Sequence, residues 1–247
     1  MRGSVLLGFS GGIDSCTSAR RLMDEGYRVV ALTIDTIGDE KMLTKAEVSA
    51  HELDIEWLCY DAKELFQKSI VDYFCNEYRH GHTPAPCTRC NPLIKWRILA
   101  EEADRLGIHH IATGHYFNIG KRGDLYYVTK GLDESKDQSY YLWGLTQDIL
   151  SRAITPMGNA IKSDVKRSFK DKSESMGICF LQGIPYAEYL AKQGIAMSEG
   201  DIVSTSGELC GRHNGIARYT IGQRRGVGIP EGMRVVGIDA QNNSVIV

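Results

Sequence analysis

Short apolar segments alternate with amphipathic ones through the first half of the chain. The apolar segments predict buried strands at residues 5–9, 28–35, 55–60 and 109–115. The segments between them carry apolar residues at helical spacing and predict helices at 14–25, 43–53 and 93–106. Strands that alternate with helices form a parallel sheet, which binds ligands at the carboxyl ends of its strands. The pattern therefore predicts a doubly wound α/β domain.

The pattern changes after Gly120. Residues 125–130 alternate in polarity like one strand of a hairpin. Beyond residue 198, short β-like runs separated by glycines appear at 201–204, 208–211, 217–221 and 234–238. We therefore predict two domains, residues 1–150 and residues 151–247, of which the second is smaller and of mixed α+β type.

The composition restricts the cellular setting. With 247 residues, of which 43% are hydrophobic, the chain is long enough for one large core or two smaller ones. No apolar stretch approaches the ~18 residues of a membrane span, so we expect no membrane partner. Seven cysteines in a chain without a recognisable signal peptide favour reduced thiols and a cytoplasmic location. The net charge of −2 does not by itself indicate a nucleic-acid partner.

Residues 10–15, Ser-Gly-Gly-Ile-Asp-Ser, lie between the first predicted strand and the first predicted helix. A glycine turn at a helix N-terminus binds anions, because free N–H groups and the positive end of the helix dipole meet there. Gly11 and Gly12 permit a close approach of the backbone, and Ser10 and Ser15 add hydroxyl donors. The spacing matches neither GxxxxGK[ST] nor GxGxxG. It resembles the PP-loop, SGGxDS, of the N-type ATP pyrophosphatases, which implies ATP and Mg²⁺ as cofactors.

Cys87 and Cys90 form a CxxC motif just before a helix that we expect to start at Asn91. The helix N-terminus would favour the thiolate form of a nearby cysteine. A lone CxxC is compatible with half a zinc site, a redox pair or two cluster ligands. Because one CxxC cannot complete a tetrahedral all-cysteine site, structural zinc is the weakest of these interpretations.

Cys179 is the third informative thiol. It lies in a short apolar run beyond the predicted domain boundary, beside Ile178 and Phe180. A cysteine in such a run is commonly an inert core residue. The alternative is a reactive thiol that faces a substrate cleft.

Six motifs occur in a fixed order along the chain: SGGIDS, PCTRCN, ATGHY, KDQSYYL, SMGICF and GRHNGIARYTIGQRRGVGI. Together they resemble the tRNA-specific 2-thiouridylases, the MnmA family, from residue 5 to about residue 238. The resemblance implies ATP-dependent 2-thiolation of the wobble uridine of tRNA, by adenylation of the C2 oxygen and sulfur transfer from a cysteine persulfide. It also implies tRNA and a persulfide sulfur-donor protein as partners.

The resemblance implies roles for three groups of residues. Cys90 corresponds to the family's nucleophilic cysteine, and Cys179 to the cysteine that receives the persulfide. The residues that would contact ATP are Gly8, Phe9, Ser10, Gly11, Gly12, Asp14, Ser15, Ile34 and Gly114. The residues that would meet tRNA near the wobble uridine are His115, Lys136, Asp137 and Gln138. Candidates for stacking on an extruded base, or for purely structural roles, are Tyr116, Tyr140 and Tyr141.

Three features depart from the family pattern. The family commonly ends in a C-terminal β-barrel that grips tRNA, whereas this sequence stops at Val247, so we expect weak tRNA binding with a shallow salt dependence. The segment 165–179 is shorter than usual. Cys87 stands where many members have an acidic residue, so Cys87, Cys90 and Cys179 are candidate ligands of a [4Fe–4S] cluster. We favour the persulfide route, because Cys90 and Cys179 suffice for it by thiol exchange.

Two further functions stay open at this stage. One keeps the adenylation chemistry and changes the acceptor to a small molecule, which ATP-dependent pyrophosphate release without tRNA would indicate. The other is a non-catalytic sulfur or cluster carrier, which would not bind ATP.

Overall fold

The computed structural model describes residues 2–167, 177–195, 197–225 and 228–247. The chain divides into two compact units. The first unit comprises Met1–Ser69 and Cys87–Met176, and the second comprises Ile70–Pro86 and Gly177–Val247. Most of the segment that we expect to be shorter than usual, residues 168–176, lies outside the described residues.

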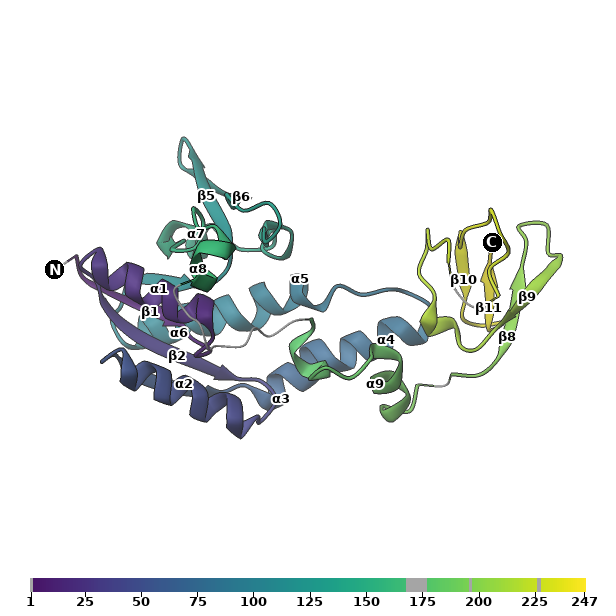
Figure 1. The fold of residues 1–247 in the computed structure, drawn as a ribbon, viewed down its shortest axis with the longest axis horizontal. Coiled ribbons are helices and arrows are strands. Elements are labelled where there is room, and N and C mark those ends of the chain that lie inside the picture. Colours follow the sequence, from purple (N-terminus) through teal and green to yellow (C-terminus); the bar gives the residue numbers. More distant parts are fainter. Residues whose placement is uncertain (1, 168–176, 196, 226–227) are drawn as a thin grey trace. The chain divides into compact units, whose positions relative to one another are not determined.

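A five-stranded parallel sheet forms the centre of the first unit (Figure 1). Its strands are β1 (Ser4–Gly8), β2 (Arg28–Asp35), β3 (Glu56–Asp61), β4 (His110–Thr113) and β7 (Ala153–Ile154). Their order is β3-β2-β1-β4-β7, and every neighbouring pair is parallel. The strand order reverses between β1 and β4, which is where a doubly wound sheet binds its ligand. The predicted α/β fold class is confirmed.

Two helices cover one face of this sheet. Helices α1 (Ile13–Asp24) and α2 (Glu40–Glu52) bury small and aliphatic side chains against alternate residues of β1 and β2. Val5 and Leu7 of β1 lie in the same cluster as Leu22 of α1 and Ala46 of α2. Because successive strand residues face opposite sides, Leu6 is buried on the other face.

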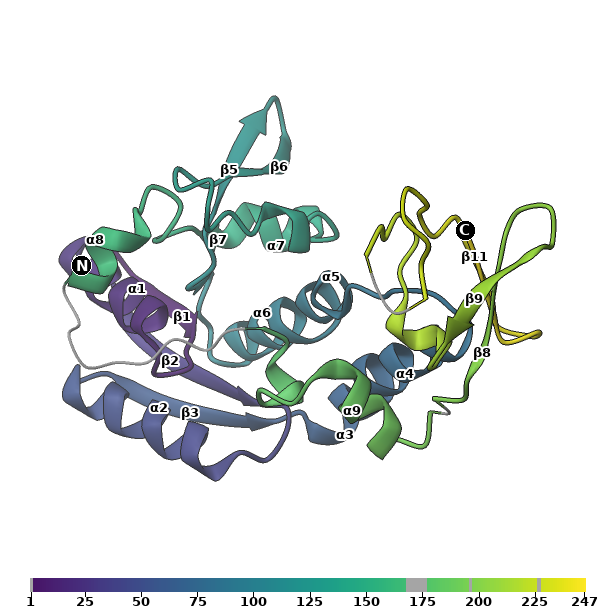
Figure 2. The same cartoon turned by 45° about the vertical axis from the view of Figure 1, so that its right-hand side comes forward.

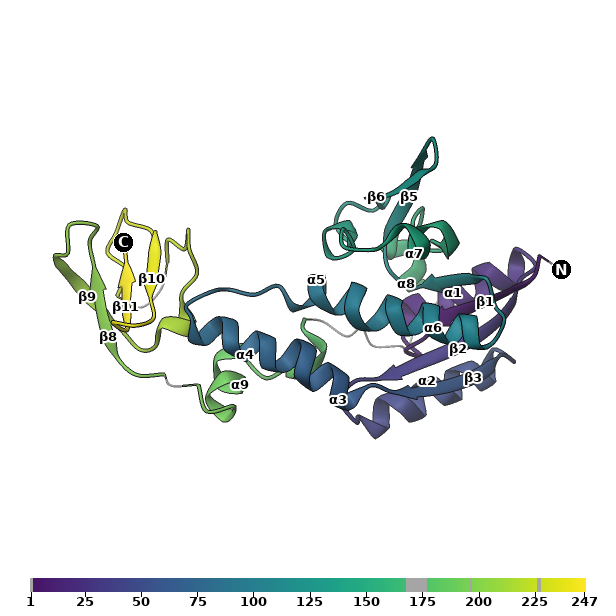
Figure 3. The ribbon, with the colours of Figure 1, turned by 180° about the vertical axis from the view of Figure 1, so that it is seen from behind.

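The opposite face carries α6 (Trp96–Arg105), which contacts β1 and β4 and can be followed in Figure 3. It continues a helical run formed by α5 (Pro86–Cys90) and a π-helical turn (Asn91–Lys95). The expected helix start at Asn91 is therefore wrong. The run begins at Pro86, because proline at the first helical position loses no hydrogen bond and already has a helical φ.

The remaining elements of the first unit follow at its edges. They are α3 (Lys63–Phe66), the first residues of a π-helical turn (Gln67–Val71), β5 (Phe117–Arg122), β6 (Leu125–Lys130), a 3₁₀ turn (Ser139–Tyr141), α7 (Gln147–Arg152) and α8 (Lys162–Arg167). β5 and β6 form an antiparallel hairpin that stands away from the main sheet (Figure 2). The strand predicted at 125–130 is confirmed as β6.

The second unit holds a smaller mixed sheet of order β10-β11-β8-β9. Its elements are α4 (Asp72–Arg79), a 3₁₀ turn (Cys179–Leu181), α9 (Tyr186–Lys192), β8 (Gly200–Val203), β9 (Leu209–His213), β10 (Gly237–Asp239) and β11 (Ser244–Ile246). Ile202, Tyr219, Val235 and Val245 form its core. The strand predicted at 217–221 is wrong, because Ile216–Arg218 forms a 3₁₀ turn that buries two of its residues.

Within the described ranges, no helix combines the length and the apolar character needed to cross a membrane.

Candidate active site

The loop between β1 and α1 is closed by its own hydroxyl groups. The Ser15 hydroxyl donates to the Gly12 carbonyl at 3.0 Å and accepts from the Ser10 amide at 3.3 Å. The Gly12 amide in turn donates to the Ser10 hydroxyl at 3.4 Å. Gly12 is the N-cap of α1, so the N–H groups of the first helical turn have no acceptor within the helix. These N–H groups and the helix dipole make the loop an anion site.

Two glycines let the ends of β1 and β4 approach this loop. Gly8 pairs with Thr113, and a Cβ on Gly8 would lie 3.3 Å from the Thr113 side chain. A Cβ on Gly114 would lie 3.2 Å from the Ser15 amide nitrogen. The strand end that carries Gly114 therefore touches the first turn of α1, and both predicted nucleotide contacts lie at the same edge of the sheet.

Phe9 and Ile34 lie at the ends of β1 and β2, also at this edge. The Phe9 amide donates to the Leu32 carbonyl at 2.8 Å, and the Phe9 carbonyl accepts from the Thr33 hydroxyl at 2.8 Å. The Phe9 side chain is buried, whereas Ile34 is half-buried. Ile34 thus offers more surface to a ligand than Phe9, whose backbone already holds the two strands together.

Asp14, in the first turn of α1, is held by two side chains from distant parts of the chain. The Lys162 ammonium lies 2.6 and 2.8 Å from its two carboxylate oxygens. The Tyr116 hydroxyl donates to the same carboxylate at 2.8 Å. Burial and this negatively charged neighbour raise the pKa of Tyr116, so the phenol stays protonated. Tyr116 is 3% exposed, so the possibility that it stacks on a base is wrong.

The CxxC motif occupies the first turns of the helical run that starts at Pro86. A helix that joins two parallel strands runs antiparallel to them, so the start of this run lies at the carboxyl edge of the sheet. The stacking of Trp96 on His115, at 6.4 Å between ring centroids, agrees with this placement. Cys90 is buried and Cys87 is half-buried. The topology thus brings Cys90 and the Ser10–Ser15 loop to one edge of one sheet.

His115 follows β4 and is neutral. Burial and the nearby positive charge of Lys95 lower its pKa from 6.5 to about 3. Its Nδ1 atom lies 2.8 Å from the Thr113 hydroxyl. At physiological pH the ring can therefore exchange hydrogen bonds with a ligand but brings no charge.

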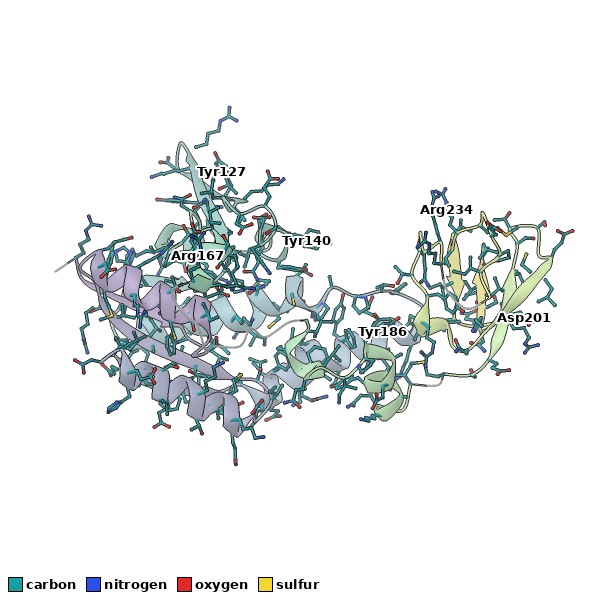
Figure 4. All side chains as sticks on the ribbon, viewed as in Figure 1. Tyr127, Tyr140, Arg167, Tyr186, Asp201 and Arg234 are labelled. Carbon is teal, nitrogen blue, oxygen red and sulfur yellow. The ribbon has the colours of Figure 1, made fainter. Side chains whose placement is uncertain are left out.

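Two of the three residues predicted to meet tRNA in the KDQ motif also support their own loop. Asp137 accepts from the Gly131 amide at 2.8 Å and from the Ser139 hydroxyl at 2.6 Å. The side-chain oxygen of Gln138 accepts from the Tyr116 amide at 3.0 Å. Lys136 is half-buried. Beside this loop, Tyr140 is 66% exposed and extends outward in Figure 4.

Cys179 belongs to the second unit and is exposed. It begins the 3₁₀ turn Cys179–Leu181, whose other two side chains are buried. Phe180 packs edge-to-face on Phe74 of α4, with ring centroids 5.2 Å apart, and lies 5.4 Å from Tyr189 of α9. The turn is thus anchored by its aromatic neighbour while the thiol stays accessible. The inert core interpretation of Cys179 is wrong.

Sequence reasoning missed Lys162. It stands at the start of a short helix without a strong hydrophobic pattern, and nothing in the local sequence distinguishes it from a surface lysine. Its side chain is buried by contacts with residues that are distant in the sequence, such as Asp14 and Tyr116. Among the described residues, no three His, Cys, Asp or Glu side chains gather into a metal-binding group.

Comparison with known proteins agrees with the family suggested by the motifs. Residues 3–183 match the family model described as the tRNA methyl transferase HUP domain, and residues 187–247 match that of the tRNA methyl transferase PRC-barrel domain. The tRNA-specific 2-thiouridylase MnmA 2 of Phocaeicola vulgatus is 43% identical over 91% of this chain and 68% of its own length. The corresponding enzyme of Syntrophomonas wolfei is 40% identical over the whole chain and 75% of its own length.

A solved structure, titled a predicted subunit of tRNA methyltransferase from Methanocaldococcus jannaschii, is 21% identical with a TM-score of 0.48. It covers 78% of this chain and 89% of its own. The chain belongs to the MnmA family of tRNA-specific 2-thiouridylases.

Proposed function

We propose that this chain catalyses the ATP-dependent 2-thiolation of the wobble uridine of tRNA. The proposal is supported by the topology, in which α1, after the Ser10–Ser15 loop, and the helical run that carries Cys90 both start on the side of the sheet where its strands end. A thiol and an anion site so arranged suit a reaction in which a phosphate group activates an atom and sulfur then replaces it. The names of the curated relatives supply the substrate class.

Adenylation is the first step of the proposed reaction. The loop amides and the N-terminus of α1 would bind the phosphates of ATP, with Ile34 and Gly114 against the rest of the nucleotide. The C2 oxygen of uridine attacks the α-phosphorus, and the bond to the bridging oxygen breaks as pyrophosphate leaves. The oxygen, otherwise a poor leaving group, can then depart as part of AMP.

Mg²⁺ would arrive with the nucleotide. Such ions are commonly held by one or two carboxylates together with substrate phosphates. Asp14 is a carboxylate in the right place, and its oxygens are engaged by Lys162 and Tyr116. The described residues thus suit an ion that shares the phosphates of ATP better than a resident metal site. The ion would offset the charge of the leaving pyrophosphate.

Sulfur transfer is the second step. A donor protein would place a persulfide on Cys179, whose exposure suits such an encounter. The terminal sulfur attacks C2, and AMP leaves. Cys90 then attacks the Cys179 sulfur of the Cys179–S–S–C2 linkage, the S–S bond breaks, and the 2-thiouridine leaves as a Cys90–Cys179 disulfide forms. In the other order, Cys90 attacks the Cys179 sulfur of the persulfide first, which forms the same disulfide and releases sulfide, and the sulfide then attacks C2 as AMP leaves. Thiols that alternate between reduced and disulfide forms need a reducing environment, which suits the cytoplasm. The cytoplasmic location stays a prediction.

The tRNA itself would lie over His115 and the loop that carries Lys136, Asp137 and Gln138. Reaction at C2 requires the uridine to leave its stack, and an exposed aromatic ring can hold the extruded base. Tyr140 is suited to this role because its ring is exposed beside that loop.

A three-cysteine [4Fe–4S] cluster is the alternative sulfur route. Cys87 and Cys90 are one helical turn apart in the first unit, and Cys179 belongs to the second. With three protein ligands, one iron would stay open to bind sulfide. This route differs from the persulfide route in its need for Cys87.

Expression in a bacterial strain that lacks its own 2-thiouridylase tests the proposed function. Mass spectrometry of bulk tRNA should show 2-thiouridine restored by this chain. Continued absence of 2-thiouridine, with the chain folded and expressed, would contradict the proposal.

A further inference from the structure

Residues 138–144, the aromatic turn, carry exposed rings on a buried anchor. The side chains of Tyr140 and Trp143 are 66% and 72% exposed, and that of Tyr141 is exposed as well. Leu142, between them, is completely buried and fixes the turn to the first unit. Trp143 has the largest exposed fraction of the large hydrophobic side chains that the structure describes. A single exposed apolar side chain is ordinary, whereas a group of them indicates a binding surface.

One end of the aromatic turn is bonded to the segment beside the Ser10–Ser15 loop. The Gln138 amide donates to the Tyr116 carbonyl at 2.8 Å, and the Tyr116 amide donates to the side-chain oxygen of Gln138 at 3.0 Å. The Tyr116 hydroxyl in turn donates to Asp14, in the first turn of α1. These hydrogen bonds fix the start of the aromatic turn relative to the loop that precedes α1.

The other end of the aromatic turn touches the helical run that carries Cys90. A Cβ on Gly144 would lie 3.4 Å from the Pro92 ring. Pro92 follows Cys90 by two residues, so the aromatic turn extends from the loop before α1 to the helical run with the thiol. In the proposed reaction the uridine lies between these two elements, because its C2 atom is activated at the first and meets sulfur at the second. Tyr140 and Trp143 therefore stand beside the reacting base.

A loop from which one base has been extruded needs a second stacking surface. When the uridine leaves its stack, the adjoining base loses the partner on one of its faces. An exposed aromatic ring can replace that partner, because every base has a π-face. If Tyr140 holds the uridine, its ring cannot also cover the adjoining base. Trp143 is three residues further along the same turn and offers a second, larger ring.

We propose that Trp143 stacks on the base that adjoins the wobble uridine in the anticodon loop, and that it thereby favours the extruded position of the uridine. This inference rests on the proposed function. Trp143 binds the substrate and takes no part in bond formation. Because stacking does not depend on the hydrogen-bonding edge of a base, Trp143 should accept any of the four bases at that position.

Binding of tRNA to the purified chain without ATP tests this role. The probe is an unmodified tRNA transcript with a wobble uridine, and filter binding measures its affinity. Trp143→Ala should bind the transcript about 5- to 100-fold more weakly, as expected for one lost base–aromatic stack, and Trp143→Phe should recover most of the loss. Tryptophan fluorescence reports the stack itself. Trp57 is half-buried and Trp96 is buried, so the transcript should quench the unsubstituted chain far more than Trp143→Phe.

Two matched controls separate stacking from other losses. Leu125→Ala removes another exposed apolar side chain, on the β5–β6 hairpin, and should bind the transcript like the unsubstituted chain. The second control uses two tRNAs, each with an abasic nucleotide on one side of the wobble uridine. One of them should bind the unsubstituted chain as weakly as the full transcript binds Trp143→Ala. Combining that tRNA with Trp143→Ala should add little further loss, because both changes remove the same contact.

Three results would overturn the inference. The first is unchanged tRNA binding by Trp143→Ala. If self-association of the chain, measured by sedimentation, were lost at the same time, the aromatic turn would be a protein interface. The second is a loss for Trp143→Ala that adds in full to the losses of both abasic tRNAs, which would show that neither adjoining base meets the ring. The third is failure of the unsubstituted chain to bind tRNA, which would overturn the proposed function itself and is distinguishable because no substitution is involved.

Discussion

A Cβ atom on Gly11 would lie 2.7 Å from the Cα atom of Ala46. Gly11 also has a φ of +66°, a backbone conformation that residues other than glycine rarely adopt. The loop between β1 and α1 is thus pressed against the backbone of α2. Gly11→Ala should therefore lower the free energy of unfolding by about 2–4 kcal/mol, because neither backbone can yield without repacking.

Gly123→Ala is the matched control for this prediction, measured by urea denaturation. Gly123 lies in the turn of the β5–β6 hairpin with a φ of +58°, and a Cβ there would meet no atom within 4 Å. Gly123→Ala should therefore lower the free energy of unfolding only by the penalty for a positive φ, about 1 kcal/mol. Similar losses for the two variants would show that the contact with α2 does not constrain the loop.

Asp14→Ala should destabilise the fold as well as abolish AMP formation. The substitution leaves the buried Lys162 ammonium without its carboxylate, which should lower the free energy of unfolding by about 2 kcal/mol or more. Asp164→Ala, which breaks the exposed pair with Arg167, should change stability little. Normal AMP formation by Asp14→Ala, measured with ATP and tRNA, would refute the assignment of the loop to ATP.

His115 should make stability depend on pH. The unfolded chain takes up a proton on this residue as the pH falls below about 6.5, whereas the folded chain resists protonation until about pH 3. The stability that the neutral His115 gives the folded chain is fully present above about pH 6.5, and it is lost as the pH falls toward 3. Between about pH 7.5 and pH 5, the free energy of unfolding should therefore fall by about 2 kcal/mol through this residue alone.

Denaturation of His115→Gln at the two pH values isolates that contribution. The variant should show a smaller loss of stability on acidification than the unsubstituted chain. His80→Gln, which replaces an exposed histidine, should behave like the unsubstituted chain. The same pH dependence in all three would mean that His115 is protonated as readily in the folded chain as in the unfolded one.

Cys87→Ala separates the two sulfur routes. Under the persulfide route the variant keeps most of its thiolation activity, because neither Cys90 nor Cys179 is changed. Under the cluster route it loses bound iron and activity together. Anaerobic reconstitution, iron analysis and a thiolation assay distinguish them. We expect an active Cys87→Ala; an iron-loaded parent protein with an inactive, iron-free variant would contradict that expectation.

Four strands of the main sheet could be predicted because their apolar runs are short and bounded by turn residues, whereas the two-residue strand β7 (Ala153–Ile154) was missed because it is too short to show a pattern. The strand predicted at 28–35 coincides with β2, and the others agree to within two residues at either end. The helix expected to start at Asn91 instead continues a helical run that begins at Pro86, because proline is favoured at the first helical position.

The parts of the site that escaped prediction depend on tertiary contacts. The sequence around Lys162 does not indicate that its ammonium is buried on Asp14, since the two residues are 148 positions apart. Tyr116 was interpreted as a stacking candidate from its residue type, whereas its ring is buried and its hydroxyl is held by Asp14. Local sequence patterns predict helices and strands. They do not predict whether a polar side chain is buried, because that depends on which distant residues pack against it.

Formation of 2-thiouridine in vitro tests the central claim most directly. The purified chain is incubated with tRNA, ATP, Mg²⁺ and a persulfide donor, and the digested tRNA is examined by mass spectrometry. We predict 2-thiouridine that requires ATP, is lost in Cys90→Ala and in Cys179→Ala, and is retained in Cys210→Ala, whose half-buried thiol lies on β9. No 2-thiouridine from a folded, ATP-binding chain, or thiolation that proceeds without ATP, would contradict the account.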